Sequence, residues 1–295
     1  MSELTMTTDH SKAEQFILKA TCEARSGVIA AVTTFLSERG CYISELSQFD
    51  DHDTGRFFMR LVGHIEMGES LLSDLREQFP EVADPFNMHW QLYEGAKPTK
   101  VLIMVSKFDH CLADLLYRLR KGELNMEVTA IVSNHLDLRP MAEREGIRFI
   151  YLPVTKENKR EQEVALLEVI EETNTELVVL ARYMQILSGS LCKELEGCAI
   201  NIHHSFLPGF KGAKPYHQAH TRGVKLIGAT AHYVTSDLDE GPIIAQAVQH
   251  VDHTYGPDAL VAVGRDTEIE ALARAVKLQI QQRVFLDGNK TVIFK

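Results

Sequence analysis

Cysteine and tryptophan are scarce in this chain, which has 5 Cys and 1 Trp among 295 residues. The cysteines are Cys22, Cys41, Cys111, Cys192 and Cys198. Their number is odd and no CxxC pair occurs, so the sequence indicates neither a disulfide scaffold nor a thiolate zinc site. Scattered cysteines of this kind are typical of a reducing compartment, and we expect a cytoplasmic protein.

The chain also lacks an excess of basic residues and long apolar runs. Lys and Arg number 31 against 41 Asp and Glu, which gives a formal net charge of -10. Because binding to phosphate backbones needs a basic field, we expect no nucleic acid partner. No run approaches the roughly 18 apolar residues of a membrane span, and the polar first residues lack the apolar core of a secretory signal. We therefore expect no membrane partner.

The rest of the composition, with 45% hydrophobic and 24% charged residues, is that of an ordinary folded protein long enough for two domains. Residues 14–94 begin with a strand-like run at Phe16–Cys22 and continue with helical spacing from Val28 to Leu36. Two alternating runs around a turn, a second helical pattern and a last strand follow. This order predicts a ferredoxin-like βαββαβ domain. Gly95 and Pro98 mark residues 95–100 as a linker.

The second pattern, over residues 101–295, alternates short apolar runs with helical patterns. The runs are VLIMVS, VTAIVSN, FIYLPV, LVVLARYM and CAINIHHS. Such alternation predicts an α/β domain with a Rossmann-like, mostly parallel sheet. Two later runs, GATAHYV and PIIAQAVQHV, follow each other closely and are expected to be antiparallel. A final helical region spans 258–285, with Gly264 as a candidate break.

Ligands of such sheets bind beyond the carboxyl ends of the strands, so the loops there are the first places to look for chemistry. Ser106–His110 follows the first run without a glycine, which disfavours a dinucleotide or phosphate loop. Asn201 and His203 end the fifth run on one face by period-2 alternation. Both can donate to an oxyanion, and Asp239 is a candidate carboxylate partner from a later loop. The alternative is that strand-end polar residues are only structural, which is the commoner case.

Histidines cluster in the same part of the sequence, which raises the question of a metal. They are His203, His204, His217, His220 and His232. Adjacent His203 and His204 are expected to point to opposite faces of a strand, and no acidic residue completes a known ligand pattern around His217 and His220. We expect no metal site and favour solvated or supporting roles for these side chains.

The segments NIHHSFLPGFKGAKPYHQA and GVKLIGATAHYVTSDLDEGPIIAQ closely resemble the folate-dependent formyltransferase and deformylase superfamily. Its marks are an Asn-x-His tripeptide, a Ser-x-Leu-Pro-x-Phe-x-Gly loop and a late Leu-Asp-x-Gly-Pro. The resemblance implies that Asn201, His203 and Asp239 are catalytic and that residues 181–187 and 234–239 build the folate pocket. The side chains expected against the folate are Met184, Ile186, Leu187 and Val234. The folate is then the substrate, and no cofactor is implied.

The first domain resembles an ACT domain, with CEARSGVIAAVTTFLSERG at its ligand-binding turn. Glu23 and Ser26 depart from the residues usual there. The resemblance implies an amino-acid effector such as methionine or glycine, with Arg25 and Gly27 as candidate contacts. An ACT domain joined to this catalytic domain is the arrangement of formyltetrahydrofolate deformylases. It implies hydrolysis of 10-formyltetrahydrofolate, with water as acceptor, formate supply for purine synthesis, and a homodimer or homotetramer.

The alternative is transfer of the formyl group to an amine, as in glycinamide ribonucleotide formyltransferases. Those enzymes lack the ACT domain and carry a Gly- and Ser-containing phosphate loop. Here Phe108 and Asp109 stand in that place, and Lys107 is the one feature that favours an anion. His204 and Gln185 stand where transferases commonly have Pro and Arg. A third reading, a sensor without activity, is disfavoured by the intact Asn, His and Asp.

Overall fold

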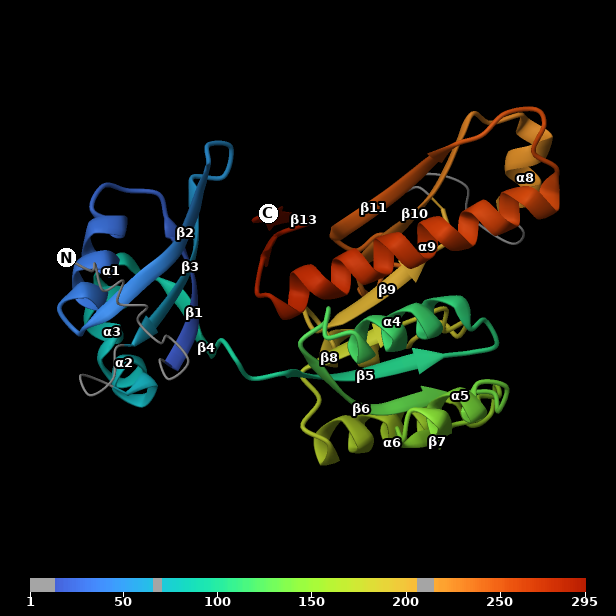
Figure 1. Ribbon diagram of the computed structural model, residues 1–295, viewed down its shortest axis with the longest axis horizontal. Coiled ribbons are helices and arrows are strands. Elements are labelled where there is room, and N and C mark those ends of the chain that lie inside the picture. Colours follow the sequence, from blue (N-terminus) through green and yellow to red (C-terminus); the bar gives the residue numbers. More distant parts are fainter. Residues whose placement is uncertain (1–13, 66–70, 206–214) are drawn as a thin grey trace, which may run out of the picture. The chain divides into compact units, whose positions relative to one another are not determined.

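The computed structural model describes residues 14–65, 71–205 and 215–295. The chain forms two compact units, 1–97 with 294–295, and 98–293, and Figure 1 shows the elements of each. Within the described ranges, no helix is both long and apolar enough to cross a membrane. All five cysteines lie in these ranges and form no disulfide.

The first unit has the predicted βαββαβ order, in which a short third helix and a 3-10 turn extend the second helical segment. Its elements are β1 (Glu14–Glu23), α1 (Val28–Ser37), β2 (Cys41–Asp51), β3 (Arg56–Ile65), α2 (Leu72–Gln78), α3 (Pro80–Ala83), η2 (Asp84–Phe86) and β4 (His89–Glu94). The four strands form one antiparallel sheet in the order β2-β3-β1-β4. The ferredoxin-like prediction is thus confirmed.

Alternate residues of β1 build the core of this unit, because strand side chains alternate between faces. Phe16 and Leu18 are fully buried on the face that the helices cover. Phe79, at the end of α2, packs edge-on against Phe35 of α1 and Trp90 of β4, with centroid distances of 5.4 and 4.7 Å. Such aromatic pairs add about 0.5–1.5 kcal/mol each beyond area burial. The helices are therefore fixed to the sheet through one ring.

The second unit contains a seven-stranded sheet in the order β11-β10-β9-β8-β5-β6-β7. Its elements are β5 (Thr99–Val105), α4 (His110–Arg120), β6 (Met126–Ser133), α5 (Arg139–Arg144), β7 (Phe149–Tyr151), α6 (Lys159–Glu172), β8 (Leu177–Leu180), α7 (Gly189–Glu194), β9 (Ala199–His203), α8 (Pro215–Arg222), β10 (Leu226–Tyr233), β11 (Ile243–His250), α9 (Pro257–Ile280), β12 (Val284–Asp287) and β13 (Lys290–Ile293). Strands β5 to β9 are parallel, and β10 and β11 are antiparallel, as predicted.

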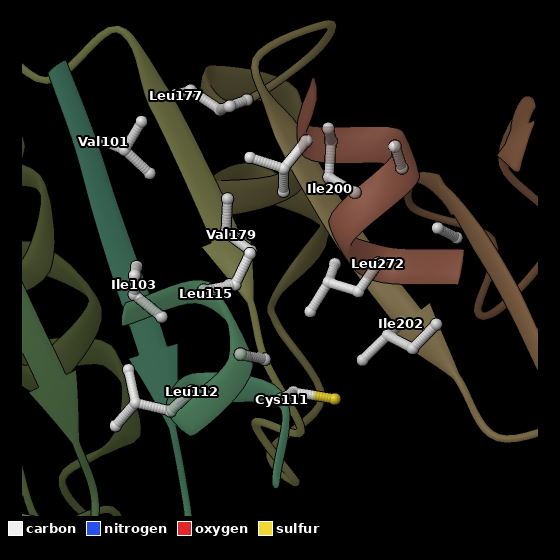
Figure 2. Close-up of a cluster of buried hydrophobic side chains, with 14 of the residues drawn as sticks. Val101, Ile103, Cys111, Leu112, Leu115, Leu177, Val179, Ile200, Ile202 and Leu272 are labelled. Carbon is white, nitrogen blue, oxygen red and sulfur yellow. The ribbon is translucent and has the colours of Figure 1, made fainter. Parts of the chain in front are cut away.

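Helices cover both faces of this sheet. Side chains of α4, α5 and α9 pack on one face with Ile103 and Val179, and α6 and α7 pack on the other with Leu102 and Leu180. Figure 2 shows the first of these cores, where Leu112 of α4 and Leu272 of α9 meet the sheet. Strand β5 begins at Thr99, which pairs with β6. The last residues of the expected linker 95–100 therefore belong to the sheet.

The end of the chain differs from the sequence expectation in two ways. Helix α9 runs unbroken through Gly264, so the candidate break there was wrong. A Cβ at Gly264 would lie 2.1 Å from Cζ of Tyr216, so the glycine allows that ring to lie against the helix backbone. The helix also stops at Ile280, and Phe285 belongs to the β12–β13 hairpin. The two-residue turn Gly288-Asn289 between the two strands is a hairpin signal that the helical pattern concealed.

Candidate active site

A cavity lies at the carboxyl ends of β8 and β9, beside the point between β5 and β8 where the strand order reverses. It contains about 870 Å³ of empty space open to solvent, a size typical of small-molecule sites. The residues that follow β8, the end of β9 and the loop after β10 supply its walls. The sequence-predicted residues that line it are Met184, Ile186, Leu187, Asn201, His203, Val234 and Asp239.

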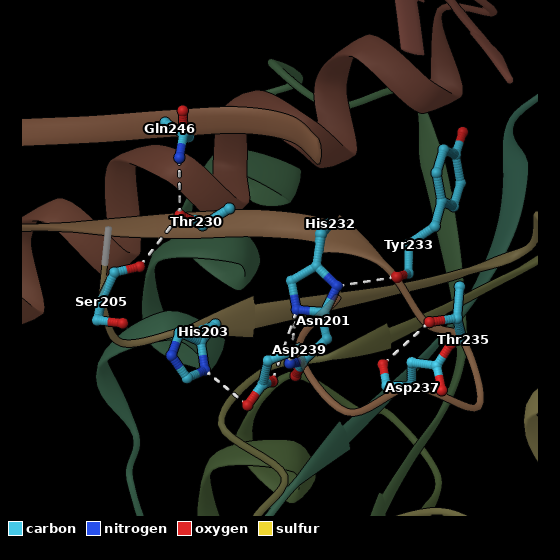
Figure 3. A network of polar contacts seen from close by, with 10 residues as sticks. All are labelled: Asn201, His203, Ser205, Thr230, His232, Tyr233, Thr235, Asp237, Asp239 and Gln246. Atoms are coloured by element: carbon cyan, nitrogen blue, oxygen red, sulfur yellow. Dashed lines mark hydrogen bonds and ion pairs between the residues drawn. The ribbon is translucent and has the colours of Figure 1, made fainter. Parts of the chain in front are cut away.

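Three polar side chains converge in this cavity, as Figure 3 shows. Nδ1 of His203 lies 3.1 Å from Oδ2 of Asp239, and Oδ1 of the same carboxylate lies 3.7 Å from Nε2 of His232. Nδ2 of Asn201 lies 3.3 Å from Nε2 of His232. The structure thus brings the predicted Asn201, His203 and Asp239 together around a fourth residue, His232.

His232 is the residue that the sequence analysis assigned to no site. It faces Asn201 because the two are register partners on β10 and β9. Its Nδ1 lies 2.8 Å from the carbonyl oxygen of Tyr233, and since a carbonyl only accepts, Nδ1 carries the proton. Its Nε2 lies against the side-chain amide of Asn201, which holds that amide beside β10. The signal for His232 was its place in an apolar strand that pairs with β9.

Asp239 reaches the histidines from a tight and strained loop. Its φ of 58° is unusual for a residue with a side chain. A Cβ at Gly241 would lie 1.8 Å from the carbonyl oxygen of Tyr233, so only glycine lets the loop close this tightly on β10. Burial raises the pKa of Asp239, but hydrogen bonds with His203 and His232 outweigh it and hold the pKa well below its usual range. The carboxylate is therefore ionised at neutral pH.

The expectation that His203 and His204 point to opposite faces was wrong. Strand β9 ends at His203, so His204 leaves the extended alternation, and the two ring centroids lie 4.8 Å apart with both rings at the cavity. Burial, and then the positive charge of Arg182, lower the pKa of His204 to about 4. His204 is therefore neutral near pH 7. The Nε2 atom of His203 is buried, and no described residue is its hydrogen-bond partner.

The apolar side of the cavity is open for a ligand. Met184 and Ile186 both line the cavity and are 51% and 61% exposed. The buried hydroxyl of Ser106 accepts from the backbone N–H of Met184 at 2.9 Å and donates to Oδ1 of Asn134 at 2.7 Å. Ser106 thereby connects this wall to the ends of β5 and β6. The sequence analysis missed this role, although Ser106 directly follows a buried strand.

A second polar cluster lies on the α4 and α9 side of the strand ends. Glu268 of α9 is 1% exposed; its Oε2 lies 2.7 Å from Nε2 of His110 and 3.2 Å from Nε of Arg182, and its Oε1 accepts from the Tyr216 hydroxyl at 2.8 Å. Burial raises the pKa of Glu268, but these partners lower it overall. An acid at helical spacing among apolar residues was the unused signal for this site.

His110, Cys111 and Glu268 form the one group of three potential metal ligands among the described residues. Burial raises the pKa of the Cys111 thiol, with a further contribution from Glu268, which disfavours the thiolate that a metal needs. The Arg182 guanidinium beside the same carboxylate would also repel a cation. The donor chemistry of this cluster therefore fits an ion-pair network better than a metal site. The expectation of no metal remains a prediction.

The candidate effector residues of the first unit lie at a shallow hollow before α1. Arg25 and Gly27 both line it, and Gly27 has a φ of 91° that favours glycine. The Arg25 guanidinium donates to the carbonyl oxygen of Pro85 and lies 4.8 Å above the Phe86 ring. Arg25 therefore has partners within its own unit, and an effector role for it remains a prediction.

Comparison with known proteins agrees with this architecture. The formyl transferase family matches residues 99–276, and the ACT domain family matches residues 16–80. A formyltetrahydrofolate deformylase from Corynebacterium sp. (strain P-1) is 55% identical over 97% of this chain and 100% of its own length. The crystal structure of a formyltetrahydrofolate deformylase from Burkholderia mallei is 54% identical, with a TM-score of 0.92 over 96% of this chain and 100% of that chain.

A glycinamide ribonucleotide transformylase from Symbiobacterium toebii is also similar, but less so. It is 27% identical, with a TM-score of 0.63, and covers 67% of this chain and 95% of its own. The deformylases are similar over both units, at about twice the identity. From the two family matches and these full-length similarities, we conclude that the chain belongs to the formyltetrahydrofolate deformylase family.

Proposed function

We propose that this chain hydrolyses 10-formyltetrahydrofolate to tetrahydrofolate and formate, with Asn201, His203 and Asp239 as its catalytic residues. The contact of Asp239 with His203 at 3.1 Å, inside an otherwise largely apolar cavity, is the observation that supports this most directly. Family membership supports the substrate, because the relatives are named for it. No cofactor enters the scheme, since the folate is the substrate.

The substrate places its pteridine against Met184, Ile186, Leu187 and Val234 and its formyl carbon beside the polar residues. Water is positioned by the Asp239 carboxylate, which is ionised and accepts a hydrogen bond from it. The water oxygen attacks the formyl carbon, and the carbonyl oxygen becomes an oxyanion. Asn201 and His203 donate to that oxyanion, and loss of one such donor typically costs 10²- to 10³-fold in rate.

The protons then balance as follows. The first water proton moves to Asp239, directly or through the His203 ring, and from there to N10 as the C–N bond breaks. The second remains on the formic acid, which ionises to formate. The depressed pKa of Asp239 makes it a weak final acceptor, so the proton passes on readily to N10. Both folate and protein return to their starting charge.

Incubation with 10-formyltetrahydrofolate and no acceptor tests this function. Tetrahydrofolate and formate should appear in equal amounts. Formylation of added glycinamide ribonucleotide faster than formate release would instead favour the transferase alternative. Against that alternative, the loop after β5 has exposed Phe108 and Asp109 where a phosphate would need backbone donors and no negative charge.

Regulation, assembly and location follow as further proposals. We propose that the first unit binds an amino acid such as methionine or glycine, and the hollow at Arg25 and Gly27 supports this.

We propose a homodimer or homotetramer, because the edge strand β2 carries exposed Tyr42 and Phe49 that a second copy can cover. A cytoplasmic location is supported by the scattered cysteines without disulfides, and the released formate would supply purine synthesis. Isothermal titration with each amino acid and light scattering test the first two proposals.

A further inference from the structure

Hydrolysis changes the charge in the cavity, because a neutral formyl group becomes the formate anion. This anion forms beside the Asp239 carboxylate, which is ionised and repels it. A cation near the catalytic residues would offset that repulsion. Among the described residues that line the cavity, Arg182 is the only lysine or arginine.

The Arg182 side chain is built into the site. It is 10% exposed, and its Nε lies 3.2 Å from Oε2 of Glu268, in an ion pair without hydrogen-bond alignment. Phe108 lies under the guanidinium at 4.8 Å from its ring centroid. Glu268 is itself held by His110 and Tyr216. The guanidinium is therefore fixed from one edge and one face.

The other edge of the guanidinium carries its two terminal nitrogens. No described residue accepts a hydrogen bond from its terminal nitrogens. Arg182 also has a φ of 64°, a strained conformation for a residue with a side chain. Arg182 and Asp239 are two of the five described non-glycine residues with positive φ, and both line the cavity. Strained residues concentrate at functional sites, so the position is consistent with a role in the reaction.

Arg182 also lies close to the catalytic residues. It follows β8, which pairs with the β9 strand that carries Asn201 and His203. Its charge acts on His204, whose ring lies 4.8 Å from that of His203. A guanidinium with two parallel N–H groups matches the two oxygens of a carboxylate.

We propose that Arg182 binds the formate product through its free edge, and that Glu268, held by His110 and Tyr216, positions it. This inference rests on the proposed hydrolysis, because that reaction generates the anion. Formate, rather than a carboxylate of the folate itself, is the ligand, since the residue adjoins the ring pair next to the catalytic centre.

Product inhibition by formate tests the proposal. Sodium formate should inhibit the wild type more than sodium chloride at equal ionic strength. Arg182→Gly should raise the inhibition constant for formate about 10- to 100-fold, the effect of losing a charge-assisted pair, with little change in KM for the folate. Glycine suits the backbone at this φ, so the variant should fold. Arg182→Lys keeps the charge but not the fork and should fall between, and Arg274→Met, an exposed site on α9, is the control.

Line broadening of carbon-13-labelled formate measures binding without turnover. Broadening by the wild type that is lost in Arg182→Gly would support the proposal even if hydrolysis were not observed. Absence of formate production would instead refute the proposed function. Unchanged formate inhibition in Arg182→Gly would overturn the proposal. So would a raised KM for the folate with unchanged formate inhibition, which would make Arg182 a ligand of the folate carboxylates.

Discussion

Replacement of Asp239 by Asn separates the chemistry of this residue from its shape. Asn has nearly the same volume, and its Oδ1 can still accept from Nδ1 of His203, which lies 3.1 Å from the carboxylate. Its NH₂ group would face Nε2 of His232, 3.7 Å from the present oxygen. The loop should therefore keep its position. An amide cannot take a proton from water, so general-base assistance is lost.

Loss of a general base typically lowers turnover by 10²- to 10⁴-fold, which corresponds to about 3–5 kcal/mol of transition-state stabilisation. We expect kcat of Asp239→Asn to fall in this range with KM little changed. Stopped assays that measure tetrahydrofolate and formate together give both constants. The matched control is Asp237→Asn, an exposed carboxylate in the same loop. Wild-type turnover in Asp239→Asn, or an equal loss in Asp237→Asn, would refute the assignment.

The remaining predictions concern Asn201, His204 and metals. Asn201→Ala should lower kcat more than it raises KM, because an oxyanion donor acts in the transition state; a change in KM alone in steady-state kinetics would make it a binding residue. The pKa of His204 falls from 6.5 unfolded to about 4 folded, so the unfolded state binds its proton first as pH drops. The free energy of unfolding should therefore decrease as the pH falls from 6.5 to 4. His204→Asn should reduce this slope in denaturant titrations, and an unchanged slope would exclude His204 as its source. Dialysis against chelator should leave activity unchanged, and loss that one divalent metal restores would contradict this.

Much of the fold was predictable because the local pattern and the tertiary environment agree. The β5 and β8 runs are buried on both faces and read as continuous apolar segments, as central parallel strands do. The β12–β13 hairpin was missed because Phe285 fits the helical spacing of α9. Its Gly288-Asn289 turn, rather than apolar periodicity, specifies the change of structure.

The site was predictable only where a motif stands in one stretch of chain. Asn201 and His203 lie at the end of one strand, and Asp239 belongs to the Leu-Asp-x-Gly-Pro motif of the family. Glu268 could not be assigned, because its partner His110 lies 158 positions away in sequence and only the packing of α9 beside α4 brings them together. Ser106 is similar, since its hydroxyl bonds to a loop from another strand.

The glycine in the middle of α9 has a consequence for protein engineering. Replacing an interior helical glycine by alanine usually stabilises a helix by about 1 kcal/mol, and automated consensus or propensity design would favour it. At Gly264 the new methyl group would displace the Tyr216 ring, and with it a donor to the carboxylate that holds Arg182. A variant thermostabilised in this way would gain helix stability but weaken the proposed binding of formate by Arg182. This position should therefore be left unchanged.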